Sequence, residues 1–238
     1  KQAYHLNQGK KVGLEYDIPA VKGKGALEYT RKIVSHFLSH ETPSVLEDMG
    51  IDTYTGTASF IDPHTLEVTF SDGSKKQVSG KNIVIATGSY PVLLPIPGLD
   101  QVPYLTNETI FDLDEIPESL AIIGGGAIGC ELAQAFSRLG AKVTIVAYMH
   151  HLLSREEPEA IQVMEEVCKK EGITLQMSCQ AKEVRKAEDK IILDIQYRES
   201  GDSTFLKVSH LLIAVGRKPN VASLNLKTIG VPFDERSG

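Results

Sequence analysis

Three glycines at the spacing Gly124-x-Gly126-x-x-Gly129 are the residues with the clearest chemical use in this sequence. Gly124 permits a tight turn out of a strand, and Gly126 lets the backbone approach a phosphate without an intervening Cβ atom. Gly129 allows the next helix to pack close to that strand. The first N–H groups of such a helix and its positive dipole end attract phosphates. The spacing therefore predicts a pyrophosphate site.

The segments on both sides of these glycines have the patterns that such a site needs. A short apolar run, 120–123, enters the glycines, and "KVTIV" at 142–146 has the composition of a second strand. Between them, apolar residues recur at helical spacing before the helix-ending Gly140: Ile128, Leu132, Ala135, Phe136 and Leu139. Strand, helix and strand follow one another within about 30 residues, which predicts a dinucleotide-binding unit rather than a bare glycine turn.

The end of the second strand lacks the acidic residue that normally reads the adenine ribose. Dinucleotide-binding units place a carboxylate there, about 20 residues after the glycines. Here Ala147 holds that place, and no carboxylate follows until Glu156. A strict NAD preference is therefore not expected. The side chains that could approach a 2′-phosphate favour NADPH: His150, His151 and Arg155.

The first half of the chain has no such glycine unit, but it ends in a similar way. A helical pattern covers 24–49 and is interrupted by Pro43. Three strand-like segments lie between residues 55 and 80, and a buried strand is expected at Ile83–Ala86, ending in Thr87-Gly88. A proline-rich connector then leads to residue 117.

The second half repeats this order after its βαβ segment. A helix is expected from Pro158 to Gly172. A strand at 172–178, three alternating segments between 182 and 210, and a buried strand ending in Val215-Gly216 follow. The repeat predicts two copies of one nucleotide-binding architecture, the first of which lacks its glycine loop.

Composition and charge exclude several classes of function. A net charge of −6 and a pI near 5.7 argue against nucleic acid as a partner. No apolar run reaches the roughly 18 residues that span a bilayer, so no membrane association is expected. The three cysteines are interpreted as small buried residues in a cytoplasmic, reducing compartment. His36 and His40 are interpreted as solvated helix residues, and no metal site is predicted.

The combined landmarks resemble the two-dinucleotide-fold flavoprotein disulfide reductases, also called class I pyridine nucleotide-disulfide oxidoreductases. The matching segments occur in family order over nearly the whole chain: "GTASF", "IVIATGSYP", "PIPGL", "IPESLAIIGGGAIGCELAQAF" and "IAVGRKPN". Within the family, the chain is most similar to mercuric reductases and next to dihydrolipoamide dehydrogenases. The resemblance implies an α/β fold with two FAD/NAD(P)-binding Rossmann-like units that carry β-meanders.

The resemblance also implies cofactors and their contact residues. It implies NAD(P)H in the second unit and FAD in the first, with hydride passing from nicotinamide to flavin. The positions that match contacts to the nicotinamide dinucleotide are Gly124, Gly125, Gly126, Ile128, Gly129, Glu131, Ala147, Val184 and Gly216. The positions that match flavin contacts are Thr57, Ala58, Thr87, Gly88, Asn107 and Arg217.

The chain departs from the family pattern at both ends. It lacks the flavin glycine loop with the redox cysteine pair, and it lacks the C-terminal domain with the His-Glu pair and the homodimer contact. We therefore expect a partial FAD-binding domain at 1–113, an NAD(P)-binding domain at 114–238, no catalytic residue and no activity of this polypeptide alone. Residues 1 to about 25 are expected to be loosely held. A non-enzymatic nucleotide-binding or redox-sensing module is the alternative.

Overall fold

The computed structural model describes residues 5, 13 and 23–234. Most of the segment expected to be loosely held, up to residue 22, lies outside the described residues. The chain divides into two units: Lys1–Ile33 with Pro91–Gly216 form unit 1, and Val34–Tyr90 with Arg217–Gly238 form unit 2. The domain boundary expected at 113/114 lies inside unit 1, because the connector from residue 91 onward packs in this unit.

Unit 1 is built on a four-stranded parallel sheet with the order β11-β5-β6-β7. The strands are β5 (Ser119–Ile123), β6 (Lys142–Val146), β7 (Thr174–Gln176) and β11 (His210–Ile213). Helix α4 (Ala127–Arg138) connects β5 to β6, and helix α5 (Pro158–Lys170) lies between β6 and β7. The predicted βαβ unit and the predicted α/β fold are therefore confirmed.

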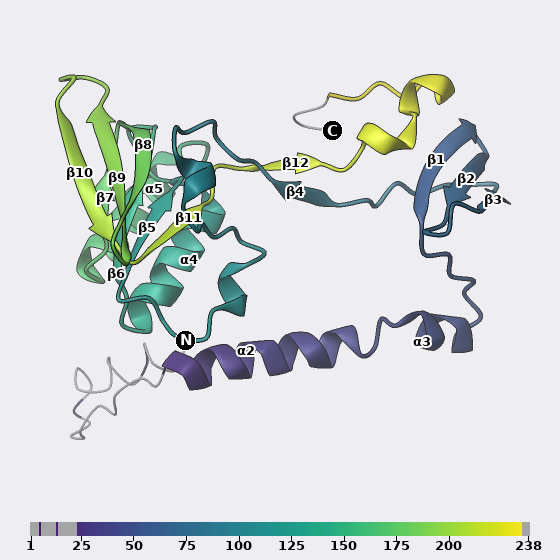
Figure 1. Cartoon of the computed structure of the whole chain (residues 1–238), viewed down its shortest axis with the longest axis horizontal. Helices are drawn as coiled ribbons and strands as arrows, with labels where there is room; N and C mark the ends of the chain where they lie inside the picture. Colours follow the sequence, from purple (N-terminus) through teal and green to yellow (C-terminus); the bar gives the residue numbers. More distant parts are fainter. Residues whose placement is uncertain (1–4, 6–12, 14–22, 235–238) are drawn as a thin grey trace. The chain divides into compact units, whose positions relative to one another are not determined.

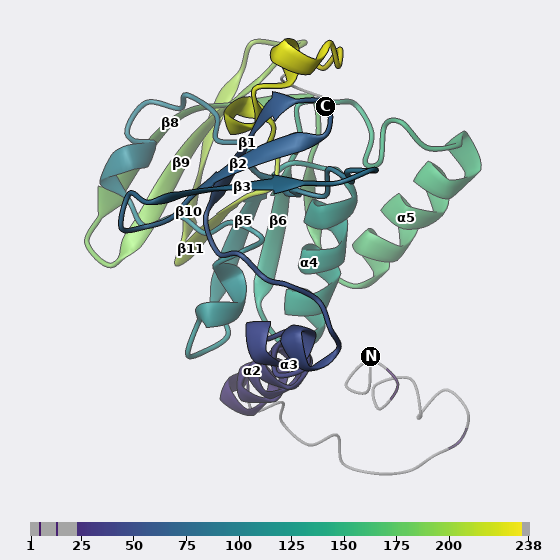
Figure 2. The ribbon, with the colours of Figure 1, turned by 90° about the vertical axis from the view of Figure 1, so that its right-hand side faces the viewer.

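A three-stranded antiparallel meander follows β7 and covers the second face of the parallel sheet. It consists of β8 (Cys179–Ala187), β9 (Lys190–Tyr197) and β10 (Ser203–Val208). Figure 2 shows α4 and α5 on one side of β5 and β6, and β8 to β10 on the other. The sheet is thus buried on both faces, as near-continuous apolar strands require.

The side chains of β5 alternate between these two layers. Leu120 and Ile122 belong to a core shared with α4 and α5, which includes Phe136. Ala121 and Ile123 belong to a second core shared with the meander. Successive side chains of a strand point to opposite faces, so one apolar strand supplies both cores.

The connector before β5 is held against the edge strand of this sheet. Short 3-10 turns occur in it at Leu99–Gln101 and Ile110–Asp112. Leu105 pairs with β11: its N–H donates to the carbonyl of Leu211 at 2.7 Å, and its carbonyl accepts from Ile213 at 2.8 Å. Residues 94–96, which precede the first turn, belong to the same unit as the glycine turn.

Unit 2 contains a second meander and a two-stranded sheet. The meander is β1 (Thr57–Asp62), β2 (Thr65–Thr69) and β3 (Lys75–Ser79), as the sequence predicts. Strand β4 (Ser89–Pro91) pairs with β12 (Arg217–Pro219), and helix α3 spans Pro43–Asp48. The small core combines Phe60 of β1 with the 3-10 turns at Ala222–Leu224 and Leu226–Ile229. Figure 1 labels the strands β1 to β4 and β12 and the helix α3.

One predicted element of unit 2 is wrong. Residues 83–86 form no strand, and Val84 is 85% exposed. A buried strand needs hydrogen-bonded neighbours and covering layers, and no strand described in unit 2 pairs with this segment. In unit 1 the corresponding strand is β11. It pairs with β5 on one side and with Leu105 of the connector on the other.

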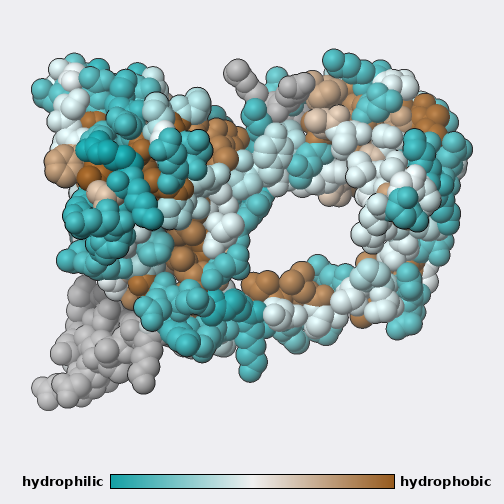
Figure 3. Space-filling model, in the orientation of Figure 1, coloured by the Kyte–Doolittle hydropathy of each residue, from teal (hydrophilic) through white to brown (hydrophobic). Residues whose placement is uncertain are grey.

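The helical pattern at 24–49 forms two helices, α2 (Gly23–Leu38) and α3, with the break before Pro43. Leu27 is the buried residue of α2, whereas Phe37 remains 64% exposed. Figure 3 shows apolar surface, in brown, along this helix. The described residues therefore leave much of the predicted apolar side of α2 uncovered.

The contact between α4 and the glycine turn predicts a large effect on stability. A Cβ atom at Gly129 would lie 2.1 Å from the carbonyl oxygen of Gly124. We expect Gly129→Ala to lower the free energy of unfolding by about 1–3 kcal/mol, because the helix must move away from the turn. Urea unfolding of unit 1 measures this change. Gly25→Ala is the matched control, since nothing lies within 4 Å of its added Cβ atom; equal stability of the two variants would contradict the prediction.

Candidate nucleotide-binding site

The turn between β5 and α4 is closed by contacts that only glycine permits. Gly124 has φ of 124°, and a Cβ atom there would lie 2.2 Å from the carbonyl oxygen of Ala214. Its N–H donates to the carbonyl of Val146 at 2.9 Å. The turn is therefore fixed between β6 and the residue that follows β11.

Gly126 opens α4 and leaves space where a side chain would stand. It is the N-cap residue, no side chain caps the helix, and nothing lies within 4 Å of an added Cβ atom. The first N–H groups of a helix have no intrahelical acceptor, and they carry the positive end of the helix dipole. The result is an open cradle for an anion, with a shape that suits a pyrophosphate.

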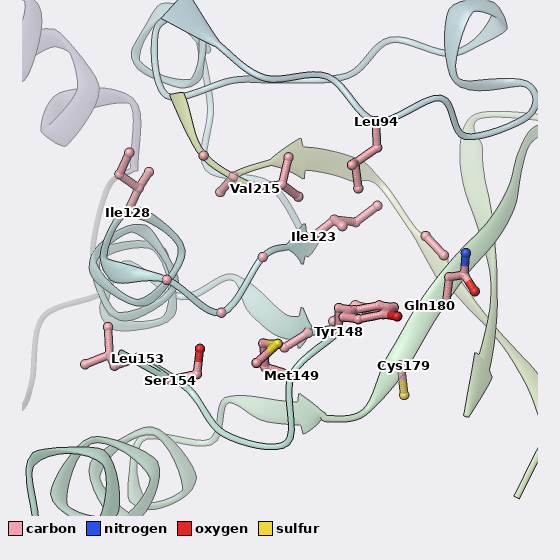
Figure 4. A pocket seen from close by; sticks show the side chains of 18 of the residues that line it. Leu94, Ile123, Ile128, Tyr148, Met149, Leu153, Ser154, Cys179, Gln180 and Val215 are labelled. Carbon is pink, nitrogen blue, oxygen red and sulfur yellow. The ribbon is translucent and has the colours of Figure 1, made fainter. Parts of the chain in front are cut away.

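This cradle forms one part of a cavity of about 700 Å³ within unit 1. The size is typical of sites for drug-sized ligands and cofactors. Its walls come from the connector, the carboxyl ends of β5, β6 and β11, the loop after β6 and the start of β8. Figure 4 shows many of them: Leu94, Pro95, Ile96, Ile123, Gly124, Gly125, Gly126, Ala127, Ile128, Val146, Ala147, Tyr148, Met149, His151, Leu153, Ser154, Arg155, Glu156, Cys179, Gln180, Ala181, Ala214, Val215 and Gly216.

The loop after β6 is tied back onto the glycine turn. The N–H of Leu153 donates to the carbonyl of Gly125 at 2.8 Å, and Leu153 has φ of 48°. The carboxylate of Glu165 on α5 accepts from the N–H of Leu152 at 3.2 Å. Its Oε1 also lies 3.1 Å from Nδ1 of His151. These bonds hold residues 151–153 in place along the cavity wall.

The charged side chains near the cavity differ in what they can offer a ligand. His150 does not line the cavity, and its Nδ1 lies 3.1 Å from Oε1 of Glu199. His151 lines it but faces Glu165. Arg155 also lines it and forms no ion pair with any residue that the structure describes. Of the three basic residues predicted from the sequence, Arg155 is thus best placed to meet a phosphate.

Six of the predicted dinucleotide contacts come together in this cavity: Gly124, Gly125, Gly126, Ile128, Ala147 and Gly216. Gly129 lies behind the turn, and Glu131 is exposed on the first turns of α4. Val184 is placed elsewhere. Its side chain is buried in the meander core, and its N–H donates to the carbonyl of Pro97 at 2.9 Å.

The predicted flavin contacts are divided between the two units. Thr57 and Ala58 lie in β1, and Asn107 belongs to unit 1. Arg217 donates to the hydroxyl of Ser89 at 2.7 Å and also to the carbonyl of Ser89. The backbone N–H of Asn220 donates to the carbonyl of Gly88 at 3.0 Å, and its side-chain amide donates to the carbonyl of Thr87 at 3.0 Å. No second glycine-rich helix start occurs in the described part of unit 2, so these residues do not provide a second cradle.

Several cavity residues were missed in the sequence: Leu94, Pro95, Ile96, Met149, Ser154, Cys179, Gln180 and Ala181. Most follow no motif and come from segments far from the glycines. Met149 could have been predicted from its position after the second strand, because residues beyond the carboxyl ends of parallel strands line the ligand crevice of such sheets. The cavity residues of β8 could not have been predicted in this way, because the meander is not part of the βαβ pattern.

The three cysteines are free and buried, as predicted. Burial raises the pKa of the Cys130 thiol to about 12, and it also raises the pKa values of the Cys168 and Cys179 thiols. The thiolate is the reactive form. Burial therefore makes these three thiols poorer nucleophiles than an exposed cysteine.

This burial predicts very slow thiol chemistry. Against an ordinary value of 9.0, a pKa of about 12 lowers the thiolate fraction of Cys130 at pH 8 about a thousandfold. We expect a disulfide reagent to find no fast thiol in the folded chain and all three after unfolding in guanidinium. Rapid labelling of Cys130 in the folded chain, located by mass spectrometry, would contradict this account of its burial.

Among the described residues, no group of three or more His, Cys, Asp or Glu side chains could hold a metal ion. His36 and His40 contact each other edge to face, with ring centroids 4.9 Å apart. Nor does the described part of the chain contain a helix long and apolar enough to cross a membrane.

Comparison with known proteins decides the family. The family model for "Pyridine nucleotide-disulphide oxidoreductase" matches residues 13–238. The chain belongs to this family. A mercuric reductase from Streptomyces lividans is 37% identical over 224 residues, which cover 94% of the chain and 47% of that protein. A dihydrolipoamide dehydrogenase from Chaetomium thermophilum is 35% identical over 190 residues, covering 79% of the chain and 37% of that protein.

A solved flavoprotein disulfide reductase has a similar fold. The HOCl-induced flavoprotein disulfide reductase RclA from Escherichia coli superimposes with a TM-score of 0.77 at 28% identity, covering 98% of the chain and 49% of that structure. The chain thus spans about half the length, or less, of these relatives. The resemblance predicted from the sequence motifs, to mercuric reductases and dihydrolipoamide dehydrogenases, is confirmed.

Proposed function

We propose that unit 1 binds a nicotinamide dinucleotide, with its pyrophosphate over the N-terminus of α4. The observation that carries this proposal is the open space at Gly126, the N-cap residue of α4, which lines a cavity of suitable size. The residues present fit the cofactor: glycine backbone for the phosphates, and apolar walls from residues 94–96 for its uncharged parts. NAD(P)H supplies a hydride when it is bound.

The end of β6 favours NADPH over NADH within this proposal. Ala147 lines the cavity where a ribose-reading carboxylate normally stands, and its methyl group neither bonds a ribose diol nor repels a 2′-phosphate; Glu156 is the carboxylate on the cavity wall. Arg155, which forms no ion pair with the described residues, lines the same cavity. Its role would be to bind the 2′-phosphate by a charge-assisted hydrogen bond.

For the whole protein we propose an FAD-dependent NAD(P)H oxidoreductase that passes hydride from nicotinamide to flavin and on to a disulfide/thiol or an Hg(II)-type acceptor. Support comes from the family and from the named relatives, the mercuric reductase and the dihydrolipoamide dehydrogenase. The described residues of unit 2 provide no second glycine-rich helix start for the flavin phosphates. This polypeptide alone is expected to bind nucleotide without turnover.

We also propose a cellular compartment, an assembly and an alternative function for the whole protein. Three unpaired buried cysteines support a reducing, cytoplasmic compartment. A homodimer through a further domain is expected for the whole protein. A non-enzymatic nucleotide-binding or redox-sensing module is the second candidate, and it shares the dinucleotide site, so an activity assay of the full-length protein separates the two.

Titration calorimetry of the chain with NADPH and with NADH tests the proposed site. We expect saturable one-to-one binding of both, with NADPH the tighter. Binding of neither dinucleotide by the folded chain would overturn the proposal. Binding that is unaffected when the chain carries a side chain at Gly126 would place the ligand elsewhere.

A further inference from the structure

The turn after β9 lies outside the cavity and holds the segment that follows Ala147. The guanidinium of Arg198 donates to the carbonyl of Tyr148 at 3.2 Å, and its central carbon lies 3.9 Å from the centroid of the Tyr148 ring. The backbone N–H of Arg198 donates to the carbonyl of Ser178 at 2.8 Å. One arginine thus connects the meander to the residue beside the ribose-reading position.

Glu199, the next residue of the same turn, and Ser178 before β8 also contact the segment after Ala147. Glu199 lies 3.1 Å from Nδ1 of His150, and the hydroxyl of Ser178 lies 2.9 Å from the same nitrogen. The N–H of Ser178 donates to the carbonyl of Met149 at 3.0 Å. The course of residues 148–150 is therefore set by side chains about 30 to 50 positions away in the sequence.

Tyr148 itself lines the cavity, together with Gln180 and Ala181 of β8. In Figure 4 its ring lies toward Gln180, away from Ile128 at the N-terminus of α4. The residue stays 54% exposed although the guanidinium covers part of its ring. An aromatic ring that is held flat and half exposed at a cavity wall is suited to stacking on a planar ligand.

We propose that Tyr148 stacks on the purine base of the dinucleotide, and that Arg198 is the positioning residue that holds the ring in place. This inference rests on the proposed dinucleotide site. If the pyrophosphate lies over α4 and the adenine ribose beside Ala147, the base continues along the same wall and reaches Tyr148. Figure 4 shows this wall running from the glycine turn to Gln180.

The geometry assigns Arg198 to the ring rather than to a phosphate. Its guanidinium lies over Tyr148 and bonds the backbone there, and Arg198 does not line the cavity. A cation over an aromatic ring at an exposed site stabilises the ring position modestly. Arg198 therefore acts on purine binding through Tyr148, and the 2′-phosphate is left to residues such as Arg155 that line the cavity.

The test measures binding of 5′-ADP, 2′,5′-ADP and nicotinamide mononucleotide, which lacks a purine, by NMR titration. We expect Tyr148→Ala to weaken both adenine nucleotides about tenfold, as the loss of one base–aromatic stack does, and Tyr148→Phe to change them less than about twofold. Arg198→Ala should weaken both equally, by about two- to fivefold, and Arg198→Lys should retain most of the affinity. Nicotinamide mononucleotide should bind all variants alike.

A double substitution tests whether Arg198 acts on purine binding through the Tyr148 ring or independently of it. In the Tyr148→Ala background, Arg198→Ala should lose most of its effect on the adenine nucleotides, because only its bond to the backbone carbonyl of residue 148 is left to remove. The matched control is Tyr54→Ala, which removes another exposed ring under a cation, Lys76 Nζ at 4.0 Å in unit 2, and should leave all three affinities unchanged.

The outcomes distinguish this inference from the proposed function. Selective loss of 2′,5′-ADP binding by Arg198→Ala would make Arg198 a phosphate ligand and overturn the positioning role. Unchanged 5′-ADP affinity of a folded Tyr148→Ala would overturn the stacking role alone. Failure of the unsubstituted chain to bind any of the three nucleotides would overturn the dinucleotide site and this inference with it.

Discussion

Gly126→Val should abolish measurable dinucleotide binding while the chain stays folded. Nothing lies within 4 Å of an added Cβ atom at Gly126, and its φ of −80° suits any residue, so the protein itself tolerates the change. The added side chain would occupy the place of the pyrophosphate. Losing two charge-assisted hydrogen bonds, each worth about 1.5–3 kcal/mol, weakens binding by more than a hundredfold. Titration calorimetry with NADPH measures the loss.

The comparison with Gly129→Ala makes this result specific. That substitution acts on the packing of α4, so we expect it to lower the free energy of unfolding, whereas Gly126→Val should leave the free energy of unfolding within about 0.5 kcal/mol of the parent. Undiminished NADPH affinity of Gly126→Val would show that the ligand does not reach the helix N-terminus.

Ala147→Glu should reverse the cofactor preference. A carboxylate at the end of β6 would accept hydrogen bonds from the ribose diol of NADH and would repel the 2′-phosphate of NADPH. The ratio of the two affinities should change by about ten- to a hundredfold, the size of one well-formed charge-assisted bond. The change should decrease at high salt, because the charges at this wall are partly screened. Calorimetric titration of both cofactors determines the ratio.

Ala147→Gln is the control that separates charge from size. It adds nearly the same volume without a charge, so it should not penalise NADPH selectively. Arg155→Ala should weaken NADPH and leave NADH nearly unchanged; His150→Ala, expected from the sequence to weaken NADPH as well, should have a smaller effect because His150 faces Glu199. An unchanged ratio in Ala147→Glu would mean that Ala147 does not lie beside the ribose.

The dinucleotide unit could be predicted because its signals are local. The glycine spacing, the helical period of α4 and the short apolar strands are each encoded within about 30 residues. The alternation of Leu120 to Ile123 between two cores could not be read from an all-apolar run, because its partners, the helices and the meander, come later in the chain. Both meanders followed from alternating patterns.

What could not be predicted depends on distant partners. Residues 83–86 have a strand composition but no described neighbour to pair with, and pairing rather than propensity decides whether a strand forms. The cavity wall at 179–181 and the bond from Arg198 to Tyr148 join segments that no motif links. Val184 matches a family contact position, yet its N–H is already bonded to Pro97.

An amide-resolved NMR titration with NADP⁺ tests the central claim most directly. The account predicts that the largest shifts occur at the N–H groups of residues 125–128 and around Ala147, with the amides of β1 to β3 unchanged. Shifts that leave residues 125–128 unmoved, or that centre on Thr57 and Arg217, would contradict a dinucleotide site at the N-terminus of α4.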